Sequence, residues 1–194
     1  MSMGMELNTN GLTYEDLLLL PDDGKRHELI GGEHYVTPSP NFFHQSFVGE
    51  LSRVIDNFLE EKKLGILLSA PFDVLLSPRD VVEPDLLFVS SSRIGRITDK
   101  NVNGAPDLVV EVISESTRRT DKKTKLRLYE SSDVIEYWLA DPVVQTVEIY
   151  SRSQENRLVR TAEYEETDIL KSDLFPGLVI NLADLWVDRR QNVE

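Results

Sequence analysis

Glu111 is a candidate functional residue, because it is a charged residue within an apolar run. Residues 104–117 read GAPDLVVEVISEST, so Val110 and Val112 flank the glutamate. A short β-branched run after turn residues is typical of a strand that is covered on both faces. An ionised carboxylate in such a strand is costly unless it is paired, hydrogen-bonded or bound to a cation. Glu111 is therefore either a structural residue that reaches solvent or a basic side chain, or a ligand.

Asp85 is a second acid at the beginning of an apolar run. It follows Pro84 and precedes LLFVS, and a proline suits the first residue of a strand. If this strand and the strand of Glu111 are neighbours, the two carboxylates converge and repel each other. A shared hard cation with oxygen ligands relieves that repulsion. We expect Mg²⁺, or Mn²⁺, as a cofactor with Asp85 and Glu111 as its ligands.

A cation is expected close to these acids. Asp121, Lys125 and Tyr129 are spaced at i, i+4 and i+8, which places them on one face of the helix that follows the strand. That face can turn Lys125 toward the carboxylates. An ammonium group next to a metal site can orient a water molecule or offset charge on a phosphoryl oxygen, as phosphodiester hydrolysis requires. An exposed Asp/Lys pair is the alternative explanation.

The strongest concentration of positive charge comes directly after Glu111. Residues 118–127 read RRTDKKTKLR, with six basic residues and one acid, in a chain whose formal net charge is −13. Arg118, Arg119, Lys122 and Lys123 are candidates for contact with a nucleic-acid backbone, although a solvated helix face would look the same. The acidic remainder of the chain opposes non-specific attraction to DNA.

Composition restricts the class of protein. The 194 residues, 40% of them hydrophobic, suffice for one substantial core, so we expect a single domain over residues 1–194 with its core at about 41–151. The absence of cysteine excludes disulfides, thiolate nucleophiles and cysteine-zinc sites. No apolar stretch approaches the length of a membrane span and the first residues do not resemble a signal peptide, so we expect a cytoplasmic protein that does not contact membranes.

Periodicity predicts an α+β (mixed α/β) fold in which helices pack on a mixed sheet. The most regular helix spans residues 41–63, where apolar residues recur every three or four positions. Gly31 and Gly32 predict the turn of a hairpin, and Thr13 and Asp16 predict a helix start. Further strands are expected at GILLSAPFDVLLSP (one or two), VVEPDLLFVS (one), 107–113, VIEYWLAD, QTVEIYSR and RLVRTAEY; a helix is expected from 114–117 to about 131, and a strand and a short helix near the C-terminus.

The segments VVEPDLLFV and GAPDLVVEVISESTRRTDKKTKLRLYESSDVIEYWLADP resemble the Uma-two family of bacterial proteins regarded as endonucleases, within the PD-(D/E)XK nuclease superfamily. The N-terminal HELIGGEHYVTPSPNFFHQ and the C-terminal LFPGLVINLADLW resemble it as well. The resemblance implies a restriction-endonuclease-like core, with added N-terminal and C-terminal hairpins, in which Asp85 and Glu111 are the two acids. The superfamily's lysine would stand at position 113, where this chain has Ile113. Lys125 is the candidate for a lysine that has moved to the next helix.

Other residues are candidates for accessory roles. The resemblance implies that an acid from the first helix or its approach stands beside the metal, and Glu28 and Glu50 compete for this position. His44, near the start of the long helix, could cap that helix or contact phosphate, although a lone histidine is more often structural. Asp107 lies four residues before Glu111, about 13 Å along the strand, and is expected to begin the strand or to support the site from outside. Tyr137 and Trp138 are expected in the core, and Glu136 on an outward face.

These features together predict a metal-dependent endonuclease that hydrolyses DNA phosphodiester bonds with two carboxylates and a lysine. A homodimer is expected by analogy with such nucleases, since it would assemble a longer positive surface. Two alternatives stay open. The first is a nuclease-fold module that has lost activity with the lysine and binds protein or nucleic acid. The second is a metal-dependent phosphoryl hydrolase that acts on a smaller substrate, which the acidic surface would tolerate better.

Overall fold

A six-stranded mixed sheet forms the centre of the protein. The computed structural model describes residues 11–114, 117–118, 120–186 and 190. The strand order is β11-β10-β9-β8-β6-β3, and β8 and β9 are parallel whereas the other neighbours are antiparallel. The strands are β3 (Gly65–Ser69), β6 (Leu86–Ser90), β8 (Leu108–Val112), β9 (Glu136–Asp141), β10 (Thr146–Arg152) and β11 (Leu158–Tyr164). The predicted mixed sheet and α+β class are confirmed.

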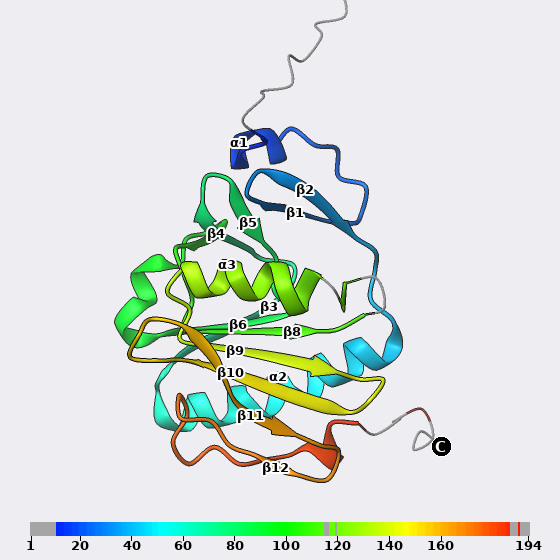
Figure 1. Ribbon diagram of the computed structural model, residues 1–194, viewed down its shortest axis with the longest axis vertical. Helices are drawn as coiled ribbons and strands as arrows, with labels where there is room; N and C mark the ends of the chain where they lie inside the picture. Colours follow the sequence, from blue (N-terminus) through cyan, green and yellow to red (C-terminus); the bar gives the residue numbers. More distant parts are fainter. Residues whose placement is uncertain (1–10, 115–116, 119, 187–189, 191–194) are drawn as a thin grey trace, which may run out of the picture.

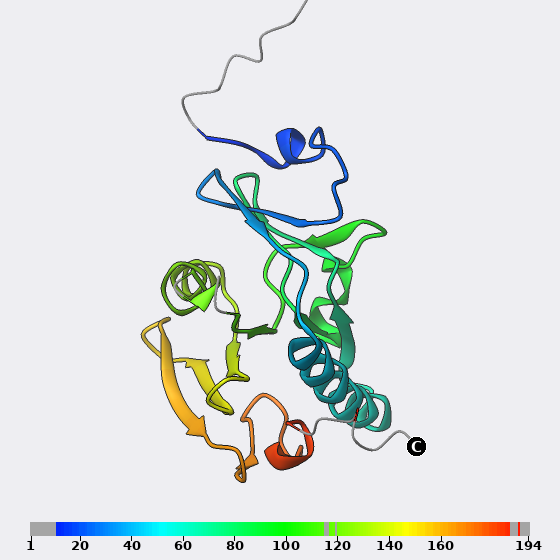
Figure 2. The same cartoon turned by 90° about the vertical axis from the view of Figure 1, so that its right-hand side faces the viewer.

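Two helical segments cover opposite faces of this sheet (Figures 1 and 2). The helix α2 (Phe42–Lys62) lies on one face, and α3 (Leu126–Ser131) lies on the other. The predicted long helix is therefore confirmed. The side chain of Asn41 accepts a hydrogen bond from the backbone N–H of His44, which caps the start of α2. Lys63 ends the helix in the left-handed conformation.

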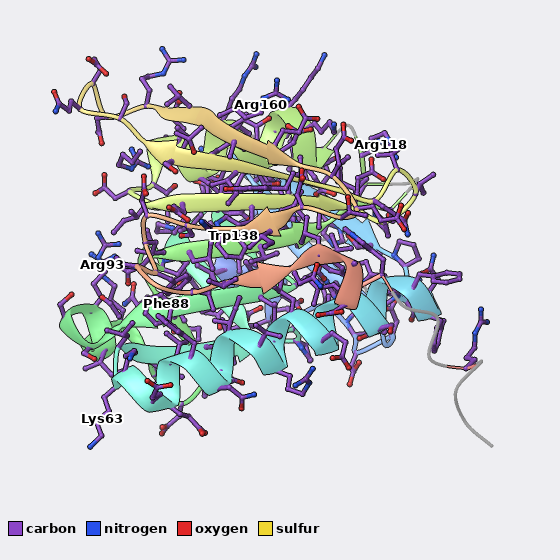
Figure 3. The ribbon with its side chains drawn as sticks, turned by 90° about the horizontal axis from the view of Figure 1, so that it is seen from below. Lys63, Phe88, Arg93, Arg118, Trp138 and Arg160 are labelled. Atoms are coloured by element: carbon purple, nitrogen blue, oxygen red, sulfur yellow. The ribbon has the colours of Figure 1, made fainter. Side chains whose placement is uncertain are left out.

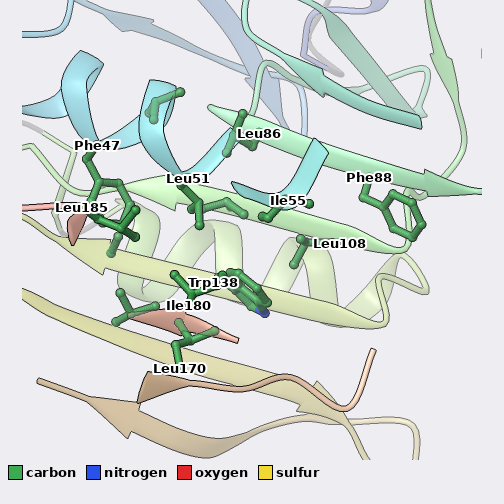
Figure 4. Close-up of a cluster of buried hydrophobic side chains, with 14 of the residues drawn as sticks. Phe47, Leu51, Ile55, Leu86, Phe88, Leu108, Trp138, Leu170, Ile180 and Leu185 are labelled. Carbon is green, nitrogen blue, oxygen red and sulfur yellow. The ribbon is translucent and has the colours of Figure 1, made fainter. Parts of the chain in front are cut away.

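The apolar core is divided by the sheet because strand residues alternate between faces. On the α2 face, Phe47, Leu51 and Ile55 pack against Leu108 and Trp138 (Figure 4). On the α3 face, Tyr129 and Tyr137 pack with residues that include Leu87, Val109 and Ile113. Every residue of β8 is buried, Glu111 included, as expected of a strand that is covered on both faces. Tyr137 and Trp138 both lie in the core, as expected.

A second sheet, of five strands, packs beside the first. Its order is β2-β1-β5-β4-β7, formed by β1 (Arg26–Ile30), β2 (Glu33–Thr37), β4 (Asp73–Ser77), β5 (Asp80–Val82) and β7 (Asn101–Asn103). The hairpin of β1 and β2 turns at Gly31 and Gly32, both with positive φ, as predicted. Ahead of it lies α1 (Tyr14–Leu17), where the carboxylate of Asp16 accepts a hydrogen bond from the backbone N–H of Thr13.

The structure corrects three elements of the prediction. VVEPDLLFVS is two strands, because the chain leaves the five-stranded sheet after Val82 and enters the six-stranded sheet at Leu86. The segment 91–105, expected to be a connection with at most a short helical turn, holds the 3₁₀ turn η1 (Ser91–Arg96) and also the strand β7, which is too short to show a pattern. The helix expected up to residue 131 is a π-helix, η2 (Thr120–Lys125), before it becomes α3.

The C-terminal part closes the α2 face of the large sheet with a small two-stranded sheet and a 3₁₀ turn. Its elements are β12 (Ile169–Leu170), β13 (Ile180–Asn181) and η3 (Leu182–Asp184). The ring of Trp186 stacks on Phe47 of α2 at a centroid distance of 4.3 Å. Within the described residues, no helix is long and apolar enough to cross a membrane.

Glu136 is buried, so the prediction that it faces outward is wrong. One of its oxygens, Oε2, accepts hydrogen bonds from Trp138 Nε1 at 2.8 Å and from Ser172 Oγ at 2.7 Å. The other, Oε1, accepts one from the backbone N–H of Leu174 at 3.2 Å. The alternation of β9 places Glu136 on the same face as Trp138, and the C-terminal segment covers it there.

Removing this carboxylate tests how firmly it holds the C-terminal segment. We expect Glu136→Ala to lower the free energy of unfolding by about 3 to 5 kcal/mol, because it leaves buried N–H and O–H donors without acceptors. Urea denaturation measures the change, with the exposed Glu166→Ala as the control. A loss below about 1 kcal/mol would show that this network contributes little to stability.

Candidate active site

A cavity of about 430 Å³ opens where the two sheets meet, and the three predicted catalytic residues and three of the accessory candidates line it. Its wall includes β1, the approach to α2, the crossing between β5 and β6, the end of β8 and the π-helix η2. The ionisable side chains of this wall are Arg26, Glu28, His44, Glu83, Asp85, Glu111, Asp121 and Lys125. Five of them are carboxylic acids and two are permanent cations, so acidic side chains outnumber basic ones in the cavity wall.

Asp85 and Glu111 are neighbours, as predicted, because β6 and β8 pair with each other. Leu86 is opposite Val110 in this antiparallel ladder, and Asp85 and Glu111 stand one position further along. Asp85 Oδ2 accepts a hydrogen bond from the backbone N–H of Val112 at 2.8 Å. This bond fixes the Asp85 carboxylate against the strand of Glu111.

The Asp85 carboxylate is held by two basic side chains. Arg26 Nη1 donates to Asp85 Oδ1 at 2.6 Å, and His44 Nε2 lies 3.0 Å from Asp85 Oδ2. Burial favours the neutral acid, but the hydrogen bond and charge of His44 and the charge of Arg26 outweigh burial and lower the pKa of Asp85 below its ordinary value. Asp85 is therefore an ionised and preorganised oxygen donor.

The Lys125 ammonium lies at the centre of the remaining acids. Lys125 Nζ donates to Glu111 Oε1 at 2.9 Å and to Glu28 Oε1 at 2.8 Å, and it lies 3.9 Å from Asp121 Oδ1. The hydroxyl of Tyr129 also donates to Glu111 Oε1, at 2.6 Å. The predicted helix face therefore does turn Asp121, Lys125 and Tyr129 toward Glu111, although half of it is a π-helix.

Burial and mutual repulsion disturb the acids of this cavity. Burial raises the pKa of Glu111 to about 8, and the neighbouring Lys125 only partly offsets the effect. Burial likewise raises the pKa of Asp121 to about 6 and that of Glu83 to about 7. The three carboxylates around Lys125 raise the pKa of its ammonium above the ordinary value despite burial. Such shifts are typical of functional sites.

The donor set suits a hard divalent cation, whereas the present arrangement is closed by basic side chains. Surplus carboxylates with raised pKa values are what a cation would neutralise. Among the described residues, however, no three histidine or carboxylate side chains converge at a geometry that could hold a metal. Arg26, His44 and Lys125 contact the carboxylate oxygens instead. Binding of a cation would therefore require these side chains to shift.

Ile113 is a core residue on the site's side of the sheet. It is 3% exposed, packs in the apolar cluster of Tyr129 and Tyr137, and also lines the cavity. Lys125, which arrives from η2, brings an ammonium to Glu111 from the next element of the chain. The structure thus places a lysine beside the second acid by a different route from the superfamily pattern.

The candidate accessory residues Glu28, Glu50 and Asp107 lie in different parts of the structure. Glu28 is buried in the cavity wall and accepts hydrogen bonds from Lys125 and from the backbone N–H of Glu83. Glu50 pairs with Arg53 at 2.7 Å and does not line the cavity. Asp107 accepts a hydrogen bond from the backbone N–H of Ser90 at 2.7 Å, at the opposite end of β8. Of these three, only Glu28 is placed near Glu111.

The basic run lies beside the cavity and is partly neutralised. Arg118 pairs with Asp141 at 2.5 Å and Lys122 pairs with Glu148 at 2.9 Å. Arg118 lies at the edge of the molecule, far from Lys63 at the end of α2 (Figure 3). Lys123 is exposed. Arg119 is outside the described residues.

Sequence reasoning missed Arg26 and Glu83. The available signal was strand alternation, since Arg26 lies two residues before Glu28 on β1 and Glu83 lies two residues before Asp85. Neither residue interrupts an apolar run, so neither attracts notice in the sequence.

Comparison with known proteins places these observations in context. The model of the Uma2 family, described as "Putative restriction endonuclease", matches residues 14–183. A solved structure from Anabaena variabilis ATCC 29413, of "a putative nuclease belonging to DUF820", superposes with a TM-score of 0.75 at 22% identity, and the match covers 90% of this chain and 97% of that one. This likeness shows a shared fold, which confirms the predicted restriction-endonuclease-like architecture.

A second solved structure is much less similar, and the curated proteins include no match. The type IIG restriction endonuclease BpuSI superposes with a TM-score of 0.41 at 9% identity, and the match covers 77% of this chain but only 16% of the BpuSI chain. No curated protein matches the chain.

The charge balance around Lys125 can be tested by stability at two pH values. We expect Lys125→Met to lower the free energy of unfolding by about 3 to 5 kcal/mol at pH 8, because buried carboxylates lose their cation. Without the ammonium, the pKa values of Glu111 and Asp121 rise further above those of the unfolded chain. A carboxylic acid whose pKa is raised in the folded state makes the folded protein less stable as pH increases. The loss of unfolding free energy in Lys125→Met is therefore smaller at pH 5 than at pH 8.

Chemical denaturation at pH 5 and pH 8 measures the difference, and Lys171→Met, at an exposed position, is the control. An equal loss at both pH values would show that the defect comes from packing and not from charge.

Proposed function

Because the chain belongs to the Uma2 family, we propose that it is a metal-dependent endonuclease that hydrolyses DNA phosphodiester bonds in the cavity of Asp85 and Glu111. The observation that carries this proposal is the convergence of these two carboxylates with Lys125, three side chains from separate elements, on one cavity. Two acids and a lysine are the set that metal-assisted phosphodiester hydrolysis needs.

Asp85 and Glu111 are the residues that would hold Mg²⁺ or Mn²⁺. Their carboxylate oxygens are hard ligands, and their positions on paired strands give them a fixed separation. A bound Mg²⁺ supplies positive charge and polarises a phosphoryl oxygen. Glu28 and Asp121 stand close enough to Lys125 to support the same site. Arg26 and His44 hold the Asp85 carboxylate in its charged form until a cation binds.

We assign to Lys125 the role of orienting the attacking water or of stabilising the charge of the transition state. An ammonium has three N–H donors, and Lys125 uses two of them on Glu28 and Glu111. Asp121 at 3.9 Å is beyond hydrogen-bond range, so a third donor is available to a water molecule or a phosphoryl oxygen in the cavity. Tyr129 holds Glu111 in place from the other side.

Binding of DNA must overcome the net charge of −13. Arg118, Arg119, Lys122 and Lys123 remain our candidates for contacts with the backbone phosphates. The pairing of Arg118 with Asp141 and of Lys122 with Glu148 weakens each contribution. A homodimer that joins two such runs would bind more strongly, and we propose that assembly for the active form.

A cleavage assay tests the proposed function. Plasmid and single-stranded DNA are incubated with Mg²⁺ or Mn²⁺ and the parent protein, Glu111→Gln or Lys125→Ala. We expect each substitution to lower the cleavage rate at least about 100-fold, because it removes a group that stabilises developing charge. Glu166→Gln and Lys171→Ala, at exposed positions, are the matched controls.

The assay also separates the alternatives. Cleavage that survives Glu111→Gln would refute the assigned site. DNA that is bound but not cleaved by the parent would favour a binding module. Hydrolysis of bis(p-nitrophenyl) phosphate without cleavage of DNA would favour a smaller substrate.

Metal binding has a readout that does not need activity. We expect millimolar Mg²⁺ to raise the melting temperature of the parent protein, because a ligand that binds only the folded state stabilises it. Asp85→Asn should abolish the increase, whereas Glu50→Gln should retain it, since Glu50 is outside the cavity. Equal increases in the parent and in Asp85→Asn would exclude Asp85 as a metal ligand.

A further inference from the structure

A second cavity, of about 210 Å³, adjoins the first at Asp85. The two cavities share Arg26, His44 and Asp85, so this ion-paired group is a common wall between them. The rest of the second cavity comes from α2, from the end of β3 and from the residue after β3. These residues are Gln45, Val48, Gly49, Ser52, Ser69 and Ala70.

The two cavities differ in charge. Five carboxylates and two permanent cations line the first. In the second, Asp85 is the one carboxylate in the wall, and it is paired with Arg26 and His44. The other polar groups of the second cavity are the neutral amide of Gln45 and the hydroxyls of two serines. A cation is therefore favoured in the first cavity, whereas an anion meets much less repulsion in the second.

The shared wall retains capacity for a ligand. His44 is 7% exposed, and its buried Nδ1 has no hydrogen-bond partner in the described part of the chain. A buried polar nitrogen without a partner is rare in a folded protein. Arg26 Nη1 donates to Asp85, so the other N–H groups of the planar guanidinium can donate to a ligand. The Arg26 side chain is 20% exposed. Arg26 can therefore hold Asp85 and an additional oxygen ligand at the same time, whereas His44 Nδ1 is buried and would have to turn toward the cavity to bind one.

We propose that the second cavity is a phosphate subsite in which Arg26, beside His44, binds a phosphate of the DNA next to the bond that is cleaved. This inference rests on the proposed function and adds a substrate position to it. Guanidinium groups bind phosphate by paired hydrogen bonds, and the small residues Gly49, Ser52 and Ala70 leave room for the group. The common wall then separates the cation from the neighbouring phosphate.

Gly49 allows the edge of the cavity to be obstructed without changing its charged residues. It lies inside α2, lines the second cavity but not the first, and a Cβ atom there would meet nothing within 4 Å. Gly49 is exposed, so Gly49→Leu adds a bulky side chain at the edge of the cavity, whereas Gly49→Ala adds one methyl group and is the matched control. Alanine and leucine both favour a helix more than glycine does, so folding is preserved.

Isothermal titration calorimetry with inorganic phosphate, without a divalent cation, measures the subsite directly. We expect Gly49→Leu and Arg26→Gln each to weaken phosphate binding at least about tenfold, and Gly49→Ala to bind like the parent. A separate Mg²⁺ titration should give the same affinity for Gly49→Leu and the parent. Phosphate binding that is unchanged in Gly49→Leu would overturn the subsite.

The DNA assay distinguishes this inference from the proposed function. An increase in KM with Gly49→Leu, at an unchanged kcat, supports the subsite as a position for DNA. Phosphate binding that depends on Gly49 and Arg26 in a protein that never cleaves DNA supports the subsite and refutes the nuclease. Cleavage with the same KM in Gly49→Leu and the parent overturns the subsite and leaves the nuclease intact.

Discussion

The Lys125 ammonium joins the two sheets, and the candidate site depends on it. It links Glu28 of β1, in the five-stranded sheet, to Glu111 of β8, in the six-stranded sheet, while its own backbone belongs to η2. All three side chains are at most 5% exposed. Burying such charges costs more desolvation energy than an apolar cluster of the same volume, so stability alone does not account for the arrangement. A role for charged groups inside the cavity accounts for the arrangement better.

The sequence predicted the centre of the site because that centre follows local periodicity. Alternation along residues 107–113 placed Glu111 on one face, and the i, i+4, i+8 spacing turned Asp121, Lys125 and Tyr129 toward it. The hairpin at Gly31 and the helix 41–63 were predicted for the same reason. Glu111 was expected to bind a metal, which stays a prediction, and the structure shows a salt bridge from Glu111 to Lys125.

Features that depend on distant pairing were not predictable. The crossing at Glu83 and Pro84 looks like one strand in the sequence, because nothing local shows that its two halves enter different sheets. Arg26 became a partner of Asp85, 59 residues away, only through the packing of β1 against β5. Glu136 was expected in solvent, and a segment from the far end of the chain covers it. Arg118 and Lys122 find their acidic partners on β9 and β10, likewise beyond local reach.

The sequence distances within the site also determine when it can form. Glu28 and Lys125 are separated by 97 residues, and Arg26 and Asp85 by 59. Contacts of such separation are made late in folding, because closing a long loop costs entropy before the contact can offset it. A nascent chain on the ribosome therefore lacks this cluster until residues beyond 125 have been synthesised and both sheets have docked. Any activity that needs this cluster would therefore begin only after the whole set of elements has been synthesised and has packed together.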